Sequence, residues 1–258
     1  MPAPENRLKS ALQSGKLQFG MWLALASPTV AEMAAGCGFD WCLIDAEHGP
    51  NSIPLILAQL QAMGTQKTSA VVRVPIGEEW MLKQVLDLGA QTVLVPMVET
   101  GEQAAGLVQA VRYPPAGRRG LGSALARASG YNAIADYPDT ANDQICLIVQ
   151  AESRAAIENI DDIAETPGVD AVFIGPYDLS ADMGYLGQPE APEVMQAIEH
   201  AIGRIRRAGK AVGLLDFNPE HIAAWQRRGV TFLAVQSDVT ALGSVLREIA
   251  KSTRAKLA

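Results

Sequence analysis

Residues 171–178 read AVFIGPYD, and residues 145–152 read ICLIVQAE. Each stretch is a short apolar run that ends directly in polar or charged residues. A run without polar alternation is typical of a strand that is covered on both faces, as in a parallel sheet. The two stretches therefore predict neighbouring buried strands at residues 145–150 and 171–174, each with a carboxylate just beyond its carboxyl end.

Similar runs recur along the chain, at residues 19–23, 41–45, 70–74, 92–96, 211–215 and 232–236. Between them lie stretches with the apolar spacing of helices, such as 193–208, 219–228 and 240–250. Strands that alternate with helices in this way predict an α/β protein with a single (β/α)8 TIM-type barrel over residues 1–258. A doubly wound open sheet is the structural alternative.

Composition limits the class of protein. The chain has 258 residues, a hydrophobic content of 48% and a net charge of −7. This charge argues against a nucleic-acid partner, because phosphate binding needs a basic surface. No apolar segment is long enough to cross a bilayer, and residues 1–18 lack the apolar core of a secretory signal, so we expect no membrane partner. Cys37, Cys42 and Cys146 show no zinc-ligand spacing, which favours buried reduced thiols and a cytoplasmic location.

One long segment, residues 113–141, departs from the alternation of strands and helices. It is rich in Pro, Gly and Ala and carries Arg118, Arg119 and Arg127. A loop of this length in a compact domain is usually functional or an interaction arm. We predict an arm at a subunit interface, with a solvated excursion as the alternative.

Two carboxylates are candidate metal ligands. Glu152 and Asp178 follow neighbouring predicted strands, at the barrel end where active sites lie. Hard divalent cations take oxygen ligands and often use only one or two protein carboxylates. Gln150 lies two residues before Glu152 on an extended segment, so both side chains can face the same side. The alternative for each acid is a helix cap or first-turn position, because Ser153 and Leu179 open helical stretches.

Three more residues with catalytic chemistry lie at or just beyond the ends of predicted strands. Asp45 ends the second strand and His48 lies three residues later, where an aspartate could fix the imidazole tautomer. The alternative is a loop histidine that is satisfied by Asp45. Arg73 ends the third strand, and a guanidinium there needs a partner, so we expect it in the barrel mouth near a carboxylate or oxyanion. A structural ion pair is its alternative. Lys67 and Lys210 precede their strands, so metal chemistry is favoured over a Schiff base.

The chain resembles the metal-dependent (class II) pyruvate aldolases of the 4-hydroxy-2-oxoheptane-1,7-dioate aldolase family, from about residue 7 to residue 250. The resemblance is carried by FDWCLIDAEH (39–48), VR (72–73), LVPM (94–97), RYPPAG (112–117), RGLGSALARAS (119–129), QAE (150–152) and FIGPYDLSADMG (173–184). It implies an aldehyde-lyase that reversibly cleaves 4-hydroxy-2-oxo acids to pyruvate and an aldehyde through a metal-stabilised pyruvate enolate.

The resemblance also implies roles for individual residues. Glu152 and Asp178 would hold Mg²⁺, Mn²⁺ or Co²⁺, Arg73 would hold the keto oxygen, and His48, supported by Asp45, would manage protons. The expected substrate-binding residues are Arg73, Gln150, Gly175, Pro176, Tyr177, Asp178, Ser123, Leu215 and Phe217. Phe217 is not the residue usual at this position in the family, and it could favour shorter or more apolar aldehydes.

The resemblance further implies an assembly. The final helix would be exchanged between subunits, and the resulting dimers would form hexamers as trimers of dimers. The arm with Ser123 and Arg127 would reach a neighbouring subunit's site.

Other functions stay open at this point. A related barrel could act on a 2-dehydro-3-deoxy sugar acid or on an acyl-CoA ester, although Arg118 and Arg119 offer little basic surface for CoA. A non-catalytic barrel could bind an oxo acid as a sensor. The joint presence of the predicted metal-binding and proton-handling residues speaks against the sensor.

Overall fold

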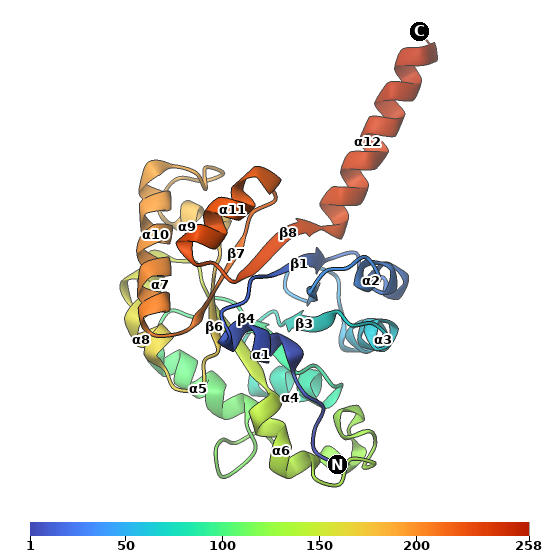
Figure 1. The fold of residues 1–258 in the computed structure, drawn as a ribbon, viewed down its shortest axis with the longest axis vertical. Coiled ribbons are helices and arrows are strands. Elements are labelled where there is room, and N and C mark those ends of the chain that lie inside the picture. Colours follow the sequence, from blue (N-terminus) through green and yellow to red (C-terminus); the bar gives the residue numbers. More distant parts are fainter. Residues whose placement is uncertain (258) are drawn as a thin grey trace.

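The computed structural model describes residues 1–257 as one closed parallel barrel with strand order β1 to β8. Figure 1 shows the strands surrounded by helices. The strands are β1 (Gln18–Leu23), β2 (Trp41–Asp45), β3 (Ser69–Arg73), β4 (Thr92–Val95), β5 (Cys146–Ala151), β6 (Ala171–Ile174), β7 (Ala211–Leu215) and β8 (Phe232–Ser237). Because β8 pairs in parallel with β1, the sheet is closed and the open-sheet alternative is wrong. The (β/α)8 prediction is confirmed.

Twelve α-helices follow the chain in the described residues. They are α1 (Arg7–Gln13), α2 (Pro28–Ala35), α3 (Ile53–Met63), α4 (Glu79–Asp87), α5 (Gly101–Val111), α6 (Tyr137–Gln144), α7 (Arg154–Glu158), α8 (Ile160–Glu165), α9 (Pro176–Asp182), α10 (Pro192–Arg207), α11 (Ile222–Arg228) and α12 (Asp238–Leu257). Three short 3-10 turns complete the elements: η1 (Ser123–Leu125), η2 (Arg127–Ser129) and η3 (Pro219–His221).

Two apolar layers explain why the strands read as continuous apolar runs. On β5, Leu147 and Val149 pack outward against the helices, while Ile148 packs into the barrel interior. Strand side chains alternate between faces, so a strand that is buried on both faces has no polar positions. The interior is filled by aromatic rings, with Trp41 and Phe232 stacked at a centroid distance of 4.1 Å. The barrel is therefore a packed core, and chemistry is confined to its ends.

The amino-terminal helix closes one end of the barrel. Leu8 and Leu12 of α1 are 1% and 4% exposed and belong to the interior apolar cluster. Asn6 caps α1 by accepting from the N–H of Lys9, and its side-chain amide donates to Thr92 at the start of β4. Helix α1 does not cover the opposite end of the barrel, at the carboxyl ends of the strands, where the predicted site residues lie.

The arm of residues 113–141 is more ordered than a plain loop, because it contains η1, η2 and the start of α6. The Arg119 side chain is 0% exposed; its Nη2 lies 2.6 Å from Asp87 Oδ1, and its guanidinium lies over the Tyr113 ring. Arg127 donates to the Leu88 carbonyl at the end of α4. The arm thus packs against its own barrel, while its place at a subunit interface stays a prediction.

Helix α12 is longer than the predicted 240–250 and projects away from the barrel (Figure 1). Only its first residue, Asp238, is buried; it accepts from the N–H groups of Ala24 and Leu25. An apolar face along this helix is exposed, formed by Val239, Leu242, Val245, Leu246 and Ile249.

The cysteine prediction is correct for two of the three thiols. Cys42 and Cys146 are buried and unpaired, and burial raises the pKa of Cys42 to about 12. Cys37 is exposed, so its predicted burial is wrong. The reason is local: α2 ends at its cap Gly36, and Cys37 lies in the turn beyond. In residues 1–257, no helix has the length and apolar character that a membrane crossing requires.

Candidate active site

The carboxyl ends of β2, β3, β5 and β6 carry most of the predicted site residues. The β2–β3 register pairs Asp45 with Arg73. Strand β5 ends one residue before Glu152, and Asp178 lies in the first turn of α9, just after β6. Because β5 and β6 are hydrogen-bonded neighbours, their two acids belong to the same rim of the barrel.

Glu152 is the most tightly held carboxylate of the group. It is 3% exposed, and its Oε1 accepts from the Met97 N–H at 2.9 Å. Its Oε2 accepts from the Gln150 side-chain amide. On the other side lies Gly175, where an added Cβ would sit 2.7 Å from Glu152 Oε2. A glycine is needed there because the backbone approaches the carboxylate closely.

Within residues 1–257, no positively charged side chain is among the groups that shift the pKa of Glu152. Burial raises the pKa of Glu152 to about 7, and the negative charges of Asp178 and Glu47 add to that rise. Hydrogen bonds from the Met97 N–H and Gln150 oppose it only in part. A bound cation would remove this penalty, because it favours the ionised carboxylate.

The available ligand atoms fit a hard cation. Glu152 and Asp178 supply carboxylate oxygens, and the buried Gln150 Oε1 has no hydrogen-bond partner within residues 1–257. Over the same described range, no three or more His, Cys, Asp or Glu side chains are grouped to hold a metal. An ion here would therefore have two protein carboxylates and complete its shell with water, as Mg²⁺ often does.

The alternative roles as a helix cap or first-turn acid fit Asp178 but not Glu152. Asp178 does occupy the first turn of α9, where a negative charge is favourable. Glu152 is not a cap, because Ser153 caps α7 by accepting from the Ala156 N–H. Capping therefore does not explain the burial of Glu152.

Arg73 forms a buried ion-pair cluster. Its Nε and Nη2 donate to the two oxygens of Asp45, both at 2.8 Å, and its Nη1 lies 2.6 Å from Glu47 Oε2. The Trp22 ring lies 4.9 Å below the guanidinium, and its Nε1 donates to Asp45. Burial acts to raise the pKa of Asp45, but the hydrogen bonds and charge of Arg73 hold it below its ordinary value. Arg73 is thus fixed in place, as bidentate pairing predicts.

The predicted support of His48 by Asp45 is wrong. Only the backbone N–H of His48 faces Asp45, at 3.4 Å, because both carboxylate oxygens bind Arg73. The His48 side chain is 67% exposed, and its Nε2 lies 4.0 Å from Glu47 Oε2. A charge-assisted bidentate pair is stronger than a bond to a neutral imidazole, so Arg73 takes the aspartate.

Glu47 is a site residue that was not predicted. It contacts Arg73, and burial raises its pKa above the ordinary value, with the charges of Asp45 and Asp178 adding to the effect of burial. The available signal in the sequence was its position between Asp45 and His48.

The remaining predicted substrate residues are spread around the rim. Gly175 is the cap residue of α9, Pro176 is buried and Tyr177 is 58% exposed. Leu215 ends β7 and packs against the interior cluster. Phe217 follows in a loop where Asp216 accepts from His221 and Trp225.

Ser123 lies apart from these residues, in η1 of the arm. No hydrogen bond or ion pair within residues 1–257 connects it to the rim carboxylates. Its predicted contact with substrate, at the site of a neighbouring subunit, stays a prediction.

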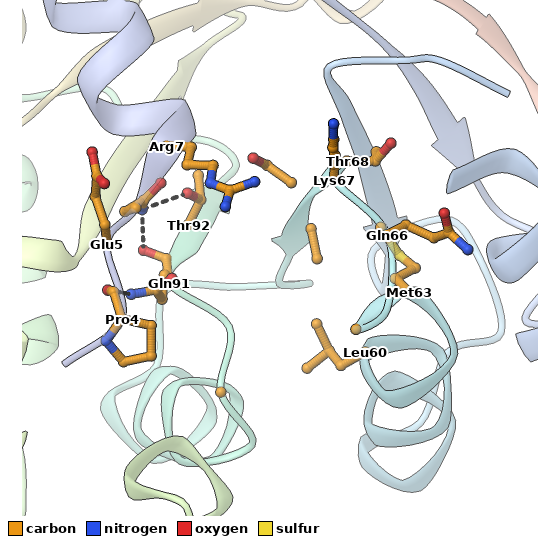
Figure 2. Close-up of a pocket in the computed structure, with 15 residues that line it drawn as sticks. Pro4, Glu5, Arg7, Leu60, Met63, Gln66, Lys67, Thr68, Gln91 and Thr92 are labelled. Carbon is orange, nitrogen blue, oxygen red and sulfur yellow. Dashed lines mark hydrogen bonds between the residues drawn. The ribbon is translucent and has the colours of Figure 1, made fainter. Parts of the chain in front are cut away.

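Two cavities differ in their relation to this rim. One of about 410 Å³ lies at the amino-terminal end, between α1, α3 and the starts of β3 and β4; it is lined by Arg7, Lys67 and Thr92 among others (Figure 2). It is at the opposite end from the carboxylates, and Lys67 lies there as predicted. A second, of about 430 Å³, lies between α4 and α5 and is lined in part by Met97, whose N–H binds Glu152.

A closed parallel barrel that carries carboxylates and a buried arginine at the carboxyl ends of its strands has the architecture of a TIM-barrel enzyme. Residues 18–244 match the family described as HpcH/HpaI aldolase/citrate lyase, and the chain belongs to this family. The predicted family and the predicted carbon–carbon lyase class are both confirmed by this match.

Individual relatives cover almost the whole chain. The chain is 54% identical over 249 residues to a hydroxypyruvate/pyruvate aldolase of Agrobacterium fabrum, covering 96% of this chain and 94% of the relative. It is 51% identical over 246 residues to a 4-hydroxy-2-oxo-heptane-1,7-dioate aldolase of Shigella sonnei, covering 95% and 94%. The crystal structure of an HpcH/HpaI aldolase/citrate lyase family protein from Burkholderia cenocepacia superposes with a TM-score of 0.93 at 36% identity, covering 96% of this chain and 99% of that one.

Proposed function

We propose that this chain catalyses the reversible retro-aldol cleavage of 4-hydroxy-2-oxo acids to pyruvate and an aldehyde, with a divalent cation held by Glu152 and Asp178. The observation that carries the proposal is the buried Glu152, whose pKa is raised to about 7 by burial and by neighbouring carboxylates. Relatives at 51–54% identity that are named aldolases support it.

Arg73 would stabilise the negative charge that develops on the 2-oxo oxygen of the substrate. When bound, Mg²⁺, Mn²⁺ or Co²⁺ would supply positive charge where the 2-oxo group becomes negative. Arg73 keeps one further N–H on each Nη after its pairs with Asp45 and Glu47, and these donate to the same oxygen. Removal of one such donor costs about 2.7–4 kcal/mol of the barrier in comparable sites. Asp45 serves to hold Arg73 in position for this contact.

His48 handles the proton at the aldehyde or alcohol oxygen. Its ring is exposed at the barrel mouth and is not engaged by Asp45, so it can turn toward substrate. Glu47 lies 4.0 Å from His48 Nε2 and takes the place of Asp45 as the acid beside the imidazole.

The substrate lies against the rim of the barrel in this proposal. The backbone from Gly175 to Asp178, with Pro176 and Tyr177 between them, receives the pyruvate carboxylate. The buried Gln150, whose Oε1 has no partner within residues 1–257, holds water or substrate beside the ion.

The aldehyde side is bounded by Leu215 and Phe217 on the loop after β7. In the proposed enzyme, Phe217 favours shorter or more apolar aldehydes. The name shared by several relatives adds hydroxypyruvate as a second donor to be tested beside pyruvate.

The proposed enzyme is a single-domain cytoplasmic protein that works as an oligomer. A second copy covers the exposed apolar face of α12, so that this helix is exchanged between subunits and dimers assemble into hexamers. Burial of such a face is favourable in proportion to its apolar area. The arm of residues 113–141 carries Ser123 toward the site of a neighbouring subunit.

A pyruvate-release assay tests the catalytic proposal. Synthetic 4-hydroxy-2-oxo acids are incubated with the purified protein, and pyruvate is measured through lactate dehydrogenase, with and without EDTA. We expect release that EDTA abolishes and Mn²⁺ restores. Turnover confined to 2-dehydro-3-deoxy sugar acids would instead favour that alternative, and absence of turnover on any hydroxy-oxo acid would favour the oxo-acid sensor.

A further inference from the structure

Met97 has an unusual backbone conformation next to the site. It follows β4 and Pro96, and its φ of 56° lies in the left-handed region. Residues other than glycine rarely adopt this region, because the Cβ crowds the backbone. Met97 is 57% exposed as a residue, so tight packing of its side chain does not account for the conformation.

The left-handed turn directs two successive N–H groups at the end of strand β5 and the residue that follows it. The Met97 N–H donates to Glu152 Oε1 at 2.9 Å, and the Val98 N–H donates to the Gln150 carbonyl at 3.0 Å. On the far side, the bare Cα of Gly175 lies against Glu152 Oε2. The carboxylate is thus held between the end of β4 and the start of α9.

We infer that Met97 is a positioning residue whose left-handed peptide, and not its side chain, fixes Glu152 for cation binding. The inference rests on the proposed function of Glu152 as a metal ligand. A carboxylate that is already oriented loses less freedom when the ion arrives, so the peptide contact strengthens binding. Hydrogen-bond partners behind metal ligands are known to change metal affinity 10–100-fold.

Three substitutions separate the peptide from the side chain. Met97→Gly keeps the N–H and adopts a positive φ without strain, so Mn²⁺ affinity should stay within about twofold of the unsubstituted protein. Met97→Ala removes the long side chain but keeps the same backbone demand, and affinity should again be retained. Met97→Val adds branching at Cβ, which disfavours the left-handed region, and Mn²⁺ binding should weaken about tenfold.

Binding is measured with Mn²⁺ alone, from the electron paramagnetic resonance signal of the free ion. Tyr131→Val is the matched control, because Tyr131 also has a φ of 56° but lies in the arm. This control should lose stability without losing Mn²⁺ affinity. Met97→Thr, which is also branched at Cβ, carries the test if the valine variant does not fold.

The outcomes distinguish this inference from the proposed function. Absence of Mn²⁺ binding by the unsubstituted protein would overturn the metal site itself. If that protein binds Mn²⁺ and a folded Met97→Val variant binds equally well, the positioning role is refuted. Loss of affinity in Met97→Gly, or an equal loss in Tyr131→Val, would also refute it, because side-chain contact or general loosening would then explain the effect.

Discussion

Replacement of Glu152 by glutamine should make the metal-free protein more stable at pH 8. The Glu152 pKa is raised from 4.5 to about 7, first by burial and then by the nearby carboxylates. A folded acid with a raised pKa binds its proton more tightly than the unfolded chain does. The contribution of protonated Glu152 to the free energy of unfolding is therefore lost as the pH rises from the pKa of the unfolded chain to that of the folded protein. Above about pH 7 this contribution is gone.

The size of this effect follows from the shift. A rise from 4.5 to about 7 corresponds to about 3 kcal/mol, at about 1.4 kcal/mol for each pKa unit. Glu152→Gln removes the buried charge, and the introduced amide can donate to the unpartnered Oε1 of Gln150 once that side chain turns. We expect the variant to exceed the unsubstituted protein by about 3 kcal/mol at pH 8 and by less than about 1 kcal/mol at pH 5.

Urea unfolding in EDTA, at one protein concentration and at both pH values, measures this difference. Thermal unfolding is measured separately, with and without Mn²⁺. The ion should raise the unfolding temperature of the unsubstituted protein but not that of Glu152→Gln, because the variant lacks the buried ligand. A variant that is less stable at pH 8, or a difference that does not change with pH, would refute the reasoning that Glu152 carries an unmatched buried charge.

Three further predictions concern proton transfer, the ion-pair cluster and assembly. His48→Ala should keep Mn²⁺ affinity but slow carbon–carbon cleavage about 10²–10⁴-fold, measured by titration and single turnover; loss of Mn²⁺ uptake would show that His48 is a ligand. Asp45→Asn should cost about 3 kcal/mol in urea unfolding at pH 7, because Arg73 loses a buried partner. The Asp45 pKa lies below its ordinary 3.8, so this advantage of the aspartate should vanish as the pH falls further below that value; a constant difference would contradict it. Leu242→Glu should reduce the particle mass in light scattering, while Lys251→Glu on the opposite face of α12 should not; equal masses in all three proteins would exclude the proposed contact.

The sequence was sufficient to predict the barrel because a strand that is buried on both faces is a continuous apolar run in the sequence. Strands β2, β6 and β7 begin and end where the apolar runs do, and the other five differ by one residue at one or both ends. Helix α12 was predicted too short because its final residues are mostly polar and carry no apolar period. The burial of Cys37 was predicted wrongly because its apolar neighbours do not show whether the residue lies in the helix or in the turn after it.

The site was less predictable because its contacts cross between strands. The adjacency of β5 and β6 followed from strand order, and it brings Glu152 and Asp178 to one rim. The choice of Asp45 between His48 and Arg73 depended on the register of β2 against β3, which residue types alone do not give. Met97 left no side-chain signal at all, because it contributes a peptide N–H.

The short helix α1 has a practical consequence for work on this protein. Leu8 and Leu12 are the floor of the barrel, beneath the stacked rings of Trp41 and Phe232. Truncation of the first dozen or so residues would admit water to the centre of the molecule, at the end remote from the reacting groups. An affinity tag fused before Met1 keeps Leu8 and Leu12 in the chain. Removal of the first residues to aid crystallisation would delete them and open this end of the barrel to water.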